Sequence, residues 1–266
     1  IIMDITATGL SHPLTSSSHR TSEQLSSGQQ INRASDGPAS IQIIEQFTSQ
    51  LQGNSAAHRN LMDGVSALQI AQGGVSQITD SLQQLRELGI QAGNGTLNDS
   101  DRAAIQSQAD ELLGGIQDAI KNSQFNGHSQ LNNTDQNTLQ SSATANTSQV
   151  LPSFDLATDF KNAGLFDIQF DAQSVSQTLN SIDDALNISD TAASAFGRSE
   201  YRFNSQAQRL IGDSLHQASS RSAIQDTDYA AASSALAREQ IQEKVEITML
   251  AQANANRDQV LKLLSF

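Results

Sequence analysis

The sequence predicts a mainly α-helical protein: an antiparallel long-helix bundle made from N- and C-terminal segments, with a small β-hairpin region in the middle. Both halves of the chain carry long rows of apolar and small residues at helical spacing, and a polar, turn-rich segment separates them. Aromatic residues make up only 4% of the 266 residues and tryptophan is absent, a composition that suits long thin helices better than a thick globular core. Because apolar rows in both halves need partners, we expect the first and last segments to lie side by side.

A long helical pattern begins at Ile41, and its clearest part runs from Leu61 to Ala92. Apolar or small residues recur at alternating steps of three and four, so they share one face of a helix. Glycine and alanine occupy several of these positions and would let a partner helix approach closely. Gly93, Asn94 and Gly95 end the pattern. The predicted seam consists of Leu61, Gly64, Leu68, Ala71, Val75, Ile78, Leu82, Leu85, Gly89 and Ala92.

A second helix should follow residues 98–101 (NDSD), whose side-chain oxygens can accept hydrogen bonds from free backbone N–H groups at a helix start. Its predicted buried face consists of Ile105, Ala109, Leu112, Ile116 and Ala119, flanked by Leu113 and Ile120.

Residues 122–171 change character. Asn126-Gly127 marks a turn, and residues 132–148 are almost entirely small and polar. The alternation of Phe166, Ile168 and Phe170 is typical of a strand, so we expect the hairpin here, surrounded by loop.

A third long helix and a C-terminal helix are predicted in the second half. The third helix carries the seam Val175, Leu179, Ile182, Leu186, Ala193, Phe196, Phe203, Ala207 and Leu210, with Ser189 and Glu200 as polar interruptions. Residues 226–228 should break it, and the C-terminal helix should run from about Tyr229 to Leu264. At the other end of the chain, residues 1–27 are polar and poorly periodic, and we expect Pro13 to interrupt any helix there.

Composition excludes several classes of protein. The net charge of -13 gives no electrostatic basis for binding nucleic acid or an anionic membrane surface. The sequence contains no apolar run of about 18 residues, so it predicts no membrane-spanning helix. The chain contains no cysteine, and its histidines lack metal-binding spacing, so we expect no enzyme activity, no cofactor and no metal site.

Both ends of the chain resemble the terminal signatures of bacterial flagellin, the subunit of the flagellar filament. The N-terminal signature is LSSGQQINRASDGPA at residues 25–39, and QFNG at 124–127 is similar to the end of the family's first conserved block. Residues 81–106 (SLQQLRELGIQAGNGTLNDSDRAAIQ) resemble the family's central helix and turn. DTDYA at 226–230 and MLAQAN at 249–254 carry the resemblance at the other end. The first 24 residues are shorter and less leucine-rich than the usual flagellin start.

The resemblance implies a domain organisation and a self-assembly site. It places an N-terminal inner-tube helix and connector in residues 1–40, bundle segments in 41–127 and 173–224, a short variable β-hairpin and loop region in 128–172, and a C-terminal inner-tube helix in 225–266. The terminal segments contain too few apolar residues for a core of their own, so we expect these residues to make contacts between subunits. The expected self-assembly residues are Leu10, Leu14, Leu25, Leu236, Ile247, Leu250, Val260, Leu261, Leu264 and Phe266.

The resemblance also implies partners and a location. We expect a helical homopolymer outside the cell in the bacterial flagellum, exported by the flagellar secretion apparatus without a cleaved signal peptide. Expected partners are further copies of the chain, a cytoplasmic export chaperone at the C-terminal helix, and hook-associated and cap proteins. A contact with the innate immune receptor for flagellin is implied at Leu85, Leu88 and Gln91, although Gln84 and Gln108 stand where Arg and Glu are typical.

Two alternatives remain open at this point. One is a hook–filament junction protein of the same family, which NRASDGPAS at residues 32–40 slightly favours. The other, from a different class, is a soluble helical binding module, which would stay monodisperse at high concentration. Filaments in the electron microscope would distinguish the main prediction from this second alternative.

Overall fold

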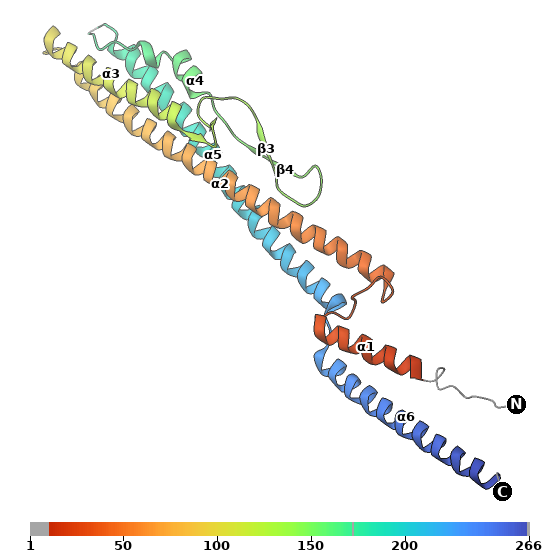
Figure 1. Ribbon diagram of the computed structural model, residues 1–266. Coiled ribbons are helices and arrows are strands. Elements are labelled where there is room, and N and C mark those ends of the chain that lie inside the picture. Colours follow the sequence, from red (N-terminus) through yellow and green to blue (C-terminus); the bar gives the residue numbers. More distant parts are fainter. Residues whose placement is uncertain (1–10, 172, 265–266) are drawn as a thin grey trace. The chain divides into compact units, whose positions relative to one another are not determined.

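The computed structural model describes the backbone of residues 11–171 and 173–264 and the side chains of residues 16–171 and 173–256. These residues fold into two compact units, one formed by residues 1–49 and 215–266 and the other by residues 50–214. The elements, in chain order (Figure 1), are α1 (Ser11–Ser27), α2 (Pro38–Ala92), α3 (Asp99–Asn122), β1 (Gln124–Phe125), β2 (His128–Ser129), β3 (Asn137–Gln140), β4 (Ser148–Leu151), α4 (Leu156–Asn162), η2 (Leu165–Asp167), α5 (Val175–Gln225) and α6 (Tyr229–Leu264). The mainly α-helical fold with a small hairpin region is confirmed.

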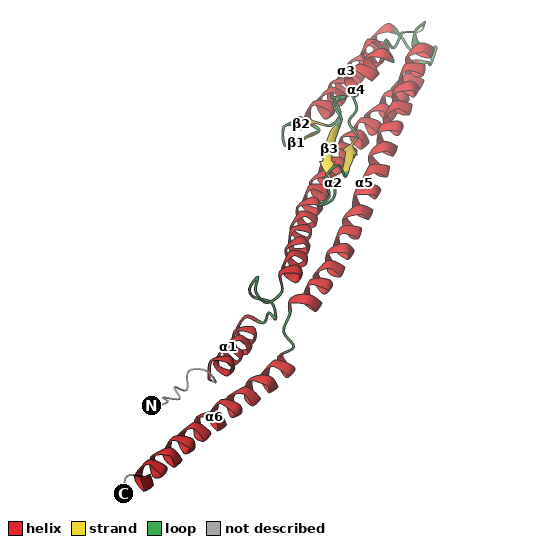
Figure 2. Cartoon of the chain, turned by 90° about the vertical axis from the view of Figure 1, so that its right-hand side faces the viewer, coloured by secondary structure: helices red, strands yellow, loops and turns green. Residues whose placement is uncertain are grey.

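The unit of residues 50–214 is a bundle of α2, α3 and α5 (Figures 1 and 2). Every residue of the seam predicted in α2 is buried. Gly89 packs against Leu179, whereas Gly64, which lies earlier in α2, packs against Phe203, which lies later in α5. The two helices are therefore antiparallel.

Polar side chains join the same two helices along the edge of the bundle. The Arg86 guanidinium lies 2.8 Å from the Asp183 carboxylate. Farther along, the amides of Gln69 and Gln72 both donate to the Glu200 carboxylate at 3.0 Å. Glu200, which interrupts the apolar seam of α5, is thus a partner for α2.

The helix α3 begins at the N-cap that the sequence predicts within residues 98–101, and the cap is a capping box. The Asn98 side chain accepts from the backbone N–H of Asp101 at 2.9 Å, and the Asp101 carboxylate accepts from the N–H of Asn98. Arg102 then donates to the carbonyls of Ala92 and Asn94 at the end of α2. The turn between α2 and α3 is therefore held by the capping box at the start of α3 and by the Arg102 side chain at the end of α2.

The hairpin region differs in detail from the expectation. The strands are two antiparallel pairs, β1 with β2 and β3 with β4. The expected strand at Phe166 to Phe170 is wrong, because this stretch forms the short helix η2 and an extended segment. Leu165, Ile168 and Phe170 are all buried in the core, and a strand would have turned alternate side chains to opposite faces.

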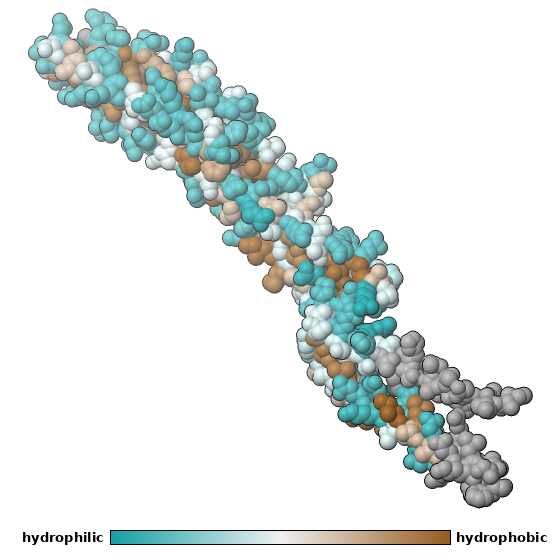
Figure 3. All heavy atoms as spheres, viewed as in Figure 1, coloured by the Kyte–Doolittle hydropathy of each residue, from teal (hydrophilic) through white to brown (hydrophobic). Residues whose placement is uncertain are grey.

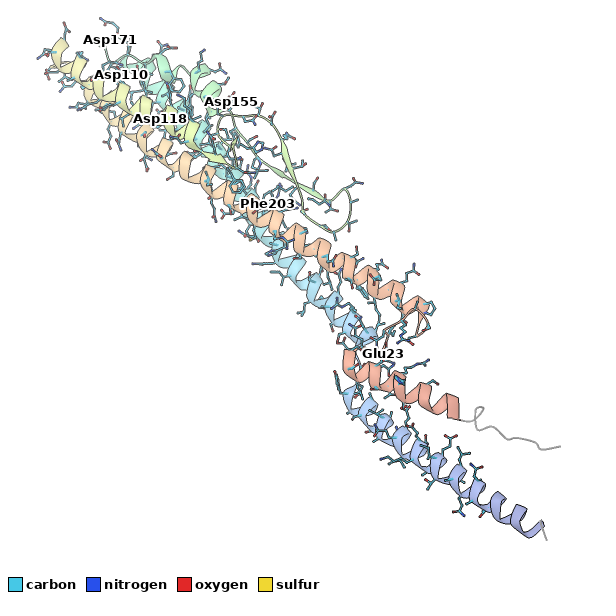
Figure 4. The ribbon with its side chains drawn as sticks, viewed as in Figure 1. Glu23, Asp110, Asp118, Asp155, Asp171 and Phe203 are labelled. Atoms are coloured by element: carbon cyan, nitrogen blue, oxygen red, sulfur yellow. The ribbon has the colours of Figure 1, made fainter. Side chains whose placement is uncertain are left out.

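The unit of residues 1–49 and 215–266 pairs α1 with α6 (Figures 1 and 2). The expected interruption at Pro13 is wrong, because α1 runs from Ser11 to Ser27. Pro13 falls in the first turn, where backbone N–H groups have no intrahelical acceptor, so the missing donor costs nothing. After α1, the connector of residues 28–37 is tied back by an ion pair of 2.8 Å between Arg33 and Glu23, the latter visible on α1 in Figure 4.

Candidate self-assembly surface

The helix α6 has two different faces. Ala232 is buried, and the half-buried positions on the same side include Leu236, Glu239, Glu243 and Leu250. Since α1 is the helix that packs beside α6, this side is the intrachain face. It is unusually acidic for a packed face, and one carboxylate oxygen of Glu239 is buried without a hydrogen-bond partner in the described part of the chain.

The opposite side of α6 is exposed and carries a row of large apolar side chains. Ile241, Val245 and Met249 are 61%, 50% and 69% exposed, and their spacing of four places them on one stripe of the helix. In Figure 3, brown atoms are visible on part of the surface around α1 and α6. We call these residues the α6 ridge. Large apolar side chains in a row on a helix surface mark a contact site more often than isolated ones do.

The structure places only some of the predicted self-assembly residues. Leu25, Leu236 and Leu250 are half-buried, and Ile247 is 61% exposed on a different stripe from the ridge. The residues outside the described backbone or side chains are Leu10, Leu14, Val260, Leu261, Leu264 and Phe266. The prediction missed all of the α6 ridge, although apolar residues at every fourth position were a visible signal.

The residues of the expected immune-receptor contact lie in the bundle. Leu85 is completely buried, so its side chain cannot meet a receptor directly while the bundle is folded. Leu88 is half-buried and Gln91 is exposed, and both border a surface groove between α2 and α3. The groove is lined by Gln84, Glu87, Leu88, Gln91, Gln108, Glu111 and Leu112.

The acidic side chains of the bundle are dispersed over its surface. Asp110 and Asp118 lie along α3, and Asp155 caps α4 (Figure 4). In the described residues no group of histidine, aspartate or glutamate side chains could hold a metal ion. Hydrogen bonds from Ser174 lower the pKa of the Asp171 carboxyl, which precedes α5 and accepts from the Ser174 N–H at 2.7 Å. Among the described residues, no helix is both long and apolar enough to cross a membrane.

Comparisons with known proteins match both ends of the chain separately. A model of the bacterial flagellin N-terminal helical region matches residues 12–138, and one of the C-terminal helical region matches residues 179–264. The "Flagellar filament 30.7 kDa core protein" of Treponema maltophilum is 31% identical over 258 residues, which cover 91% of this chain and 90% of the relative. A flagellin of Halalkalibacterium halodurans is also 31% identical, with the same coverage of both chains.

Solved structures share the fold. The crystal structure of Bacillus cereus flagellin matches 57% of this chain and 88% of its own, with a TM-score of 0.53 and 22% identity. A flagellar hook-associated protein from Vibrio parahaemolyticus matches 71% of this chain and 99% of its own, with a TM-score of 0.60 and 15% identity.

The fold and the two matched ends define a class of long-helix proteins in which an N-terminal and a C-terminal helical region pack together around a short middle segment. The chain belongs to the bacterial flagellin family.

Proposed function

We propose that this chain is a structural subunit that polymerises into the helical filament of a bacterial flagellum and so serves swimming motility. Relatives that align over 90% of their length include a filament core protein and a flagellin. The single observation on the chain itself that carries the proposal is the α6 ridge, an exposed apolar stripe opposite the face that packs on α1.

The ridge has a physical reason to be covered in an assembly. Burying a large apolar side chain contributes roughly 1.5–3 kcal/mol before ordering costs, so three such residues can drive association. A tube that grows at its end needs contacts between different surfaces of successive subunits, because a self-complementary contact would close into a dimer. We therefore assign the ridge to contacts between copies, together with Ile247, the exposed member of the sequence-predicted set. Leu25, Leu236 and Leu250 are half-buried where α1 packs beside α6, and we assign them to that contact within the chain.

The proposal assigns a place in the filament to each segment of the chain, and it includes a location and partners. Residues 1–40 and 225–266 would supply the inner layer of the filament, and residues 41–127 and 173–224 the bundle around it. The filament would lie outside the cell, after export through the flagellar apparatus. A cytoplasmic chaperone would cover the C-terminal helix before export, and hook-associated and cap proteins would meet the ends of the filament. The role is that of a building block, and we assign no catalytic step to it.

The test is seeded growth followed by electron microscopy. Purified full-length chain should elongate short filament seeds into long filaments, and a chain in which Ile241 and Val245 are both serine should elongate them poorly. The matched control is Ile241→Leu with Val245→Leu, which keeps the apolar area and the helical propensity. A wild-type chain that stays monodisperse with seeds at high concentration would reject the filament role. Equal growth of the serine and leucine variants would reject the ridge as a contact surface.

A further inference from the structure

The last turn of α1 meets the first residues of α6. A helix leaves its last carbonyls without intrahelical partners, and these carbonyls need donors from elsewhere. The Tyr229 hydroxyl donates to the Leu25 carbonyl at 3.0 Å, and the Thr227 hydroxyl donates to the Gln24 carbonyl at 3.3 Å. The Gln24 carbonyl also accepts from the Gly28 N–H at 2.9 Å, so the Thr227 bond is an additional one there, whereas the Tyr229 hydroxyl caps the Leu25 carbonyl.

Backbone hydrogen bonds join the same two segments. The Thr227 N–H donates to the Gly28 carbonyl at 3.0 Å, and the Gln30 N–H donates to the Gln225 carbonyl at 2.6 Å. Between these bonds, residues 29 and 226 form an antiparallel bridge. The connector after α1 and the break before α6 are therefore paired strand-like segments.

Gly28 permits the backbone turn between α1 and the connector. Its φ of +71° lies in the left-handed region that favours glycine, and it follows the last residue of α1 as a C-terminal cap. A Cβ at this position would lie 3.4 Å from the Tyr229 hydroxyl oxygen. That distance is ordinary van der Waals contact, so it is the left-handed backbone conformation that requires glycine here.

Among the side chains that the structure describes, the apolar contacts between α1 and α6 do not define how far one helix is shifted along the other. Leu25 and Leu236 are only half-buried, and Glu239 and Glu243 lie on the face of α6 toward α1. A slide of one helical turn, about 5.4 Å, would exchange one weak set of contacts for another. Directional hydrogen bonds at one end remove this ambiguity, because they form at one register only.

We propose that Thr227 and Tyr229 are positioning residues that set the register of α6 against α1. We call these two residues, with Leu25 to Gln30 opposite them, the register clasp. It fixes where the α6 ridge stands along α1, and a filament built from repeated contacts needs that position to be the same in every subunit. The assembly consequence rests on the proposed function; the capping of α1 does not.

Hydrogen exchange read by mass spectrometry tests the clasp directly, in the full-length chain before and after seeding. The variants are Tyr229→Phe, which removes one hydroxyl and keeps the ring, and Thr227→Val, which is nearly isosteric. The control is Tyr201→Phe, since Tyr201 is the other tyrosine of the chain, is 77% exposed, and donates no hydrogen bond among the described residues. The backbone amides of Thr227 and Gln30 should exchange roughly two- to tenfold faster in each clasp variant and at the wild-type rate in the control.

The second measurement is the rate at which seeds elongate. The double variant Thr227→Val, Tyr229→Phe should retain its helical circular dichroism but elongate seeds severalfold more slowly than Tyr201→Phe. The clasp would be overturned if the double variant exchanged at wild-type rates. It would also be overturned if the amides of Thr227 and Gln30 were unprotected in both the monomer and the filament of the wild type. Faster exchange with undiminished elongation would overturn its role in assembly. A wild-type chain that never elongates seeds would reject the filament function, while the exchange data would still decide the capping of α1.

Discussion

Gly74 of α2 lies directly against Ser123, the residue that follows α3. A Cβ on Gly74 would fall well inside van der Waals contact of the Ser123 hydroxyl and 2.8 Å from Cδ1 of the buried Leu131. Ser123 cannot easily move away, since it is buried and its hydroxyl donates to the Ala119 carbonyl at 2.7 Å. The neighbouring Gly73 has nothing within 4 Å of the same hypothetical atom.

The two adjacent glycines should therefore respond in opposite ways to alanine. Gly73→Ala should raise the free energy of unfolding by about 0.5–1 kcal/mol, because alanine loses less backbone entropy in a helix. Gly74→Ala should lower it by about 1–3 kcal/mol through overpacking. Urea titrations followed by circular dichroism measure both changes, and stabilisation by both substitutions would contradict the close contact.

Phe203 should be one of the most sensitive positions of the bundle. Its side chain is completely buried and packs beside Gly64, so Phe203→Ala leaves a cavity and should cost about 3–5 kcal/mol. Tyr201→Ala on the same helix removes an exposed ring and should change stability by less than about 0.5 kcal/mol. Thermal melts of the two variants compare them, and similar midpoints would show that the core is placed wrongly.

Acid should remove the stabilisation that the charged Asp171 carboxylate gives the folded state. Its pKa is lower in the folded state than the ordinary value of 3.8, since the carboxylate accepts hydrogen bonds from Ser174 and Gln173. The folded state therefore favours the charged form, and this stabilisation is present above the ordinary pKa and is lost as the pH falls through the lowered one. Asp171→Asn should be less stable than the wild type at pH 7 and equally stable near pH 2. A pH-independent difference in unfolding midpoints would contradict this linkage.

Deletion of residues 251–266 should abolish filament formation and leave the bundle folded. The hydrophobic cluster of the bundle lies between Ala57 and Leu210 among the described residues, outside the deleted segment. Circular dichroism should still show a cooperative melt, while seeded growth should stop because the C-terminal part of α6 is missing. Filaments of normal length from the shortened chain would contradict the assignment of this segment to the inner layer.

A chaperone for the C-terminal helix should depend on its large apolar side chains. Replacing Leu250, Leu261 and Leu264 with serine removes roughly 1.5–3 kcal/mol of transfer free energy per buried side chain. We expect the triple variant to recover much less chaperone in pull-downs from the cytoplasm and to be exported less. A triple replacement by methionine is the control, because it keeps the apolar volume. Undiminished recovery with the serine variant would place the chaperone elsewhere.

The parts of the fold that depend on local chemistry and helical period could be predicted from the order of the residues alone. The predicted seam from Leu61 to Ala92 is buried throughout, because a regular three-four spacing leaves a long helix only one apolar face. The capping box of Asn98 and Asp101 was also predictable, since its partners are three residues apart. The terminal motifs at residues 25–39 and 226–230 pointed to the family without any structure.

Contacts between residues that are far apart in the sequence could not be predicted in this way and are seen only in the folded chain. Phe166 to Phe170 has the alternation of a strand, but burial of Leu165, Ile168 and Phe170 against the bundle outweighs the weak preference of a short segment. The sequence marked residues 226–230 as a signature without saying that Tyr229 caps a helix that ends about 200 residues earlier. Hydrogen bonds between remote segments leave no periodic trace along the chain, because their geometry exists only after α1 and α6 have been brought together.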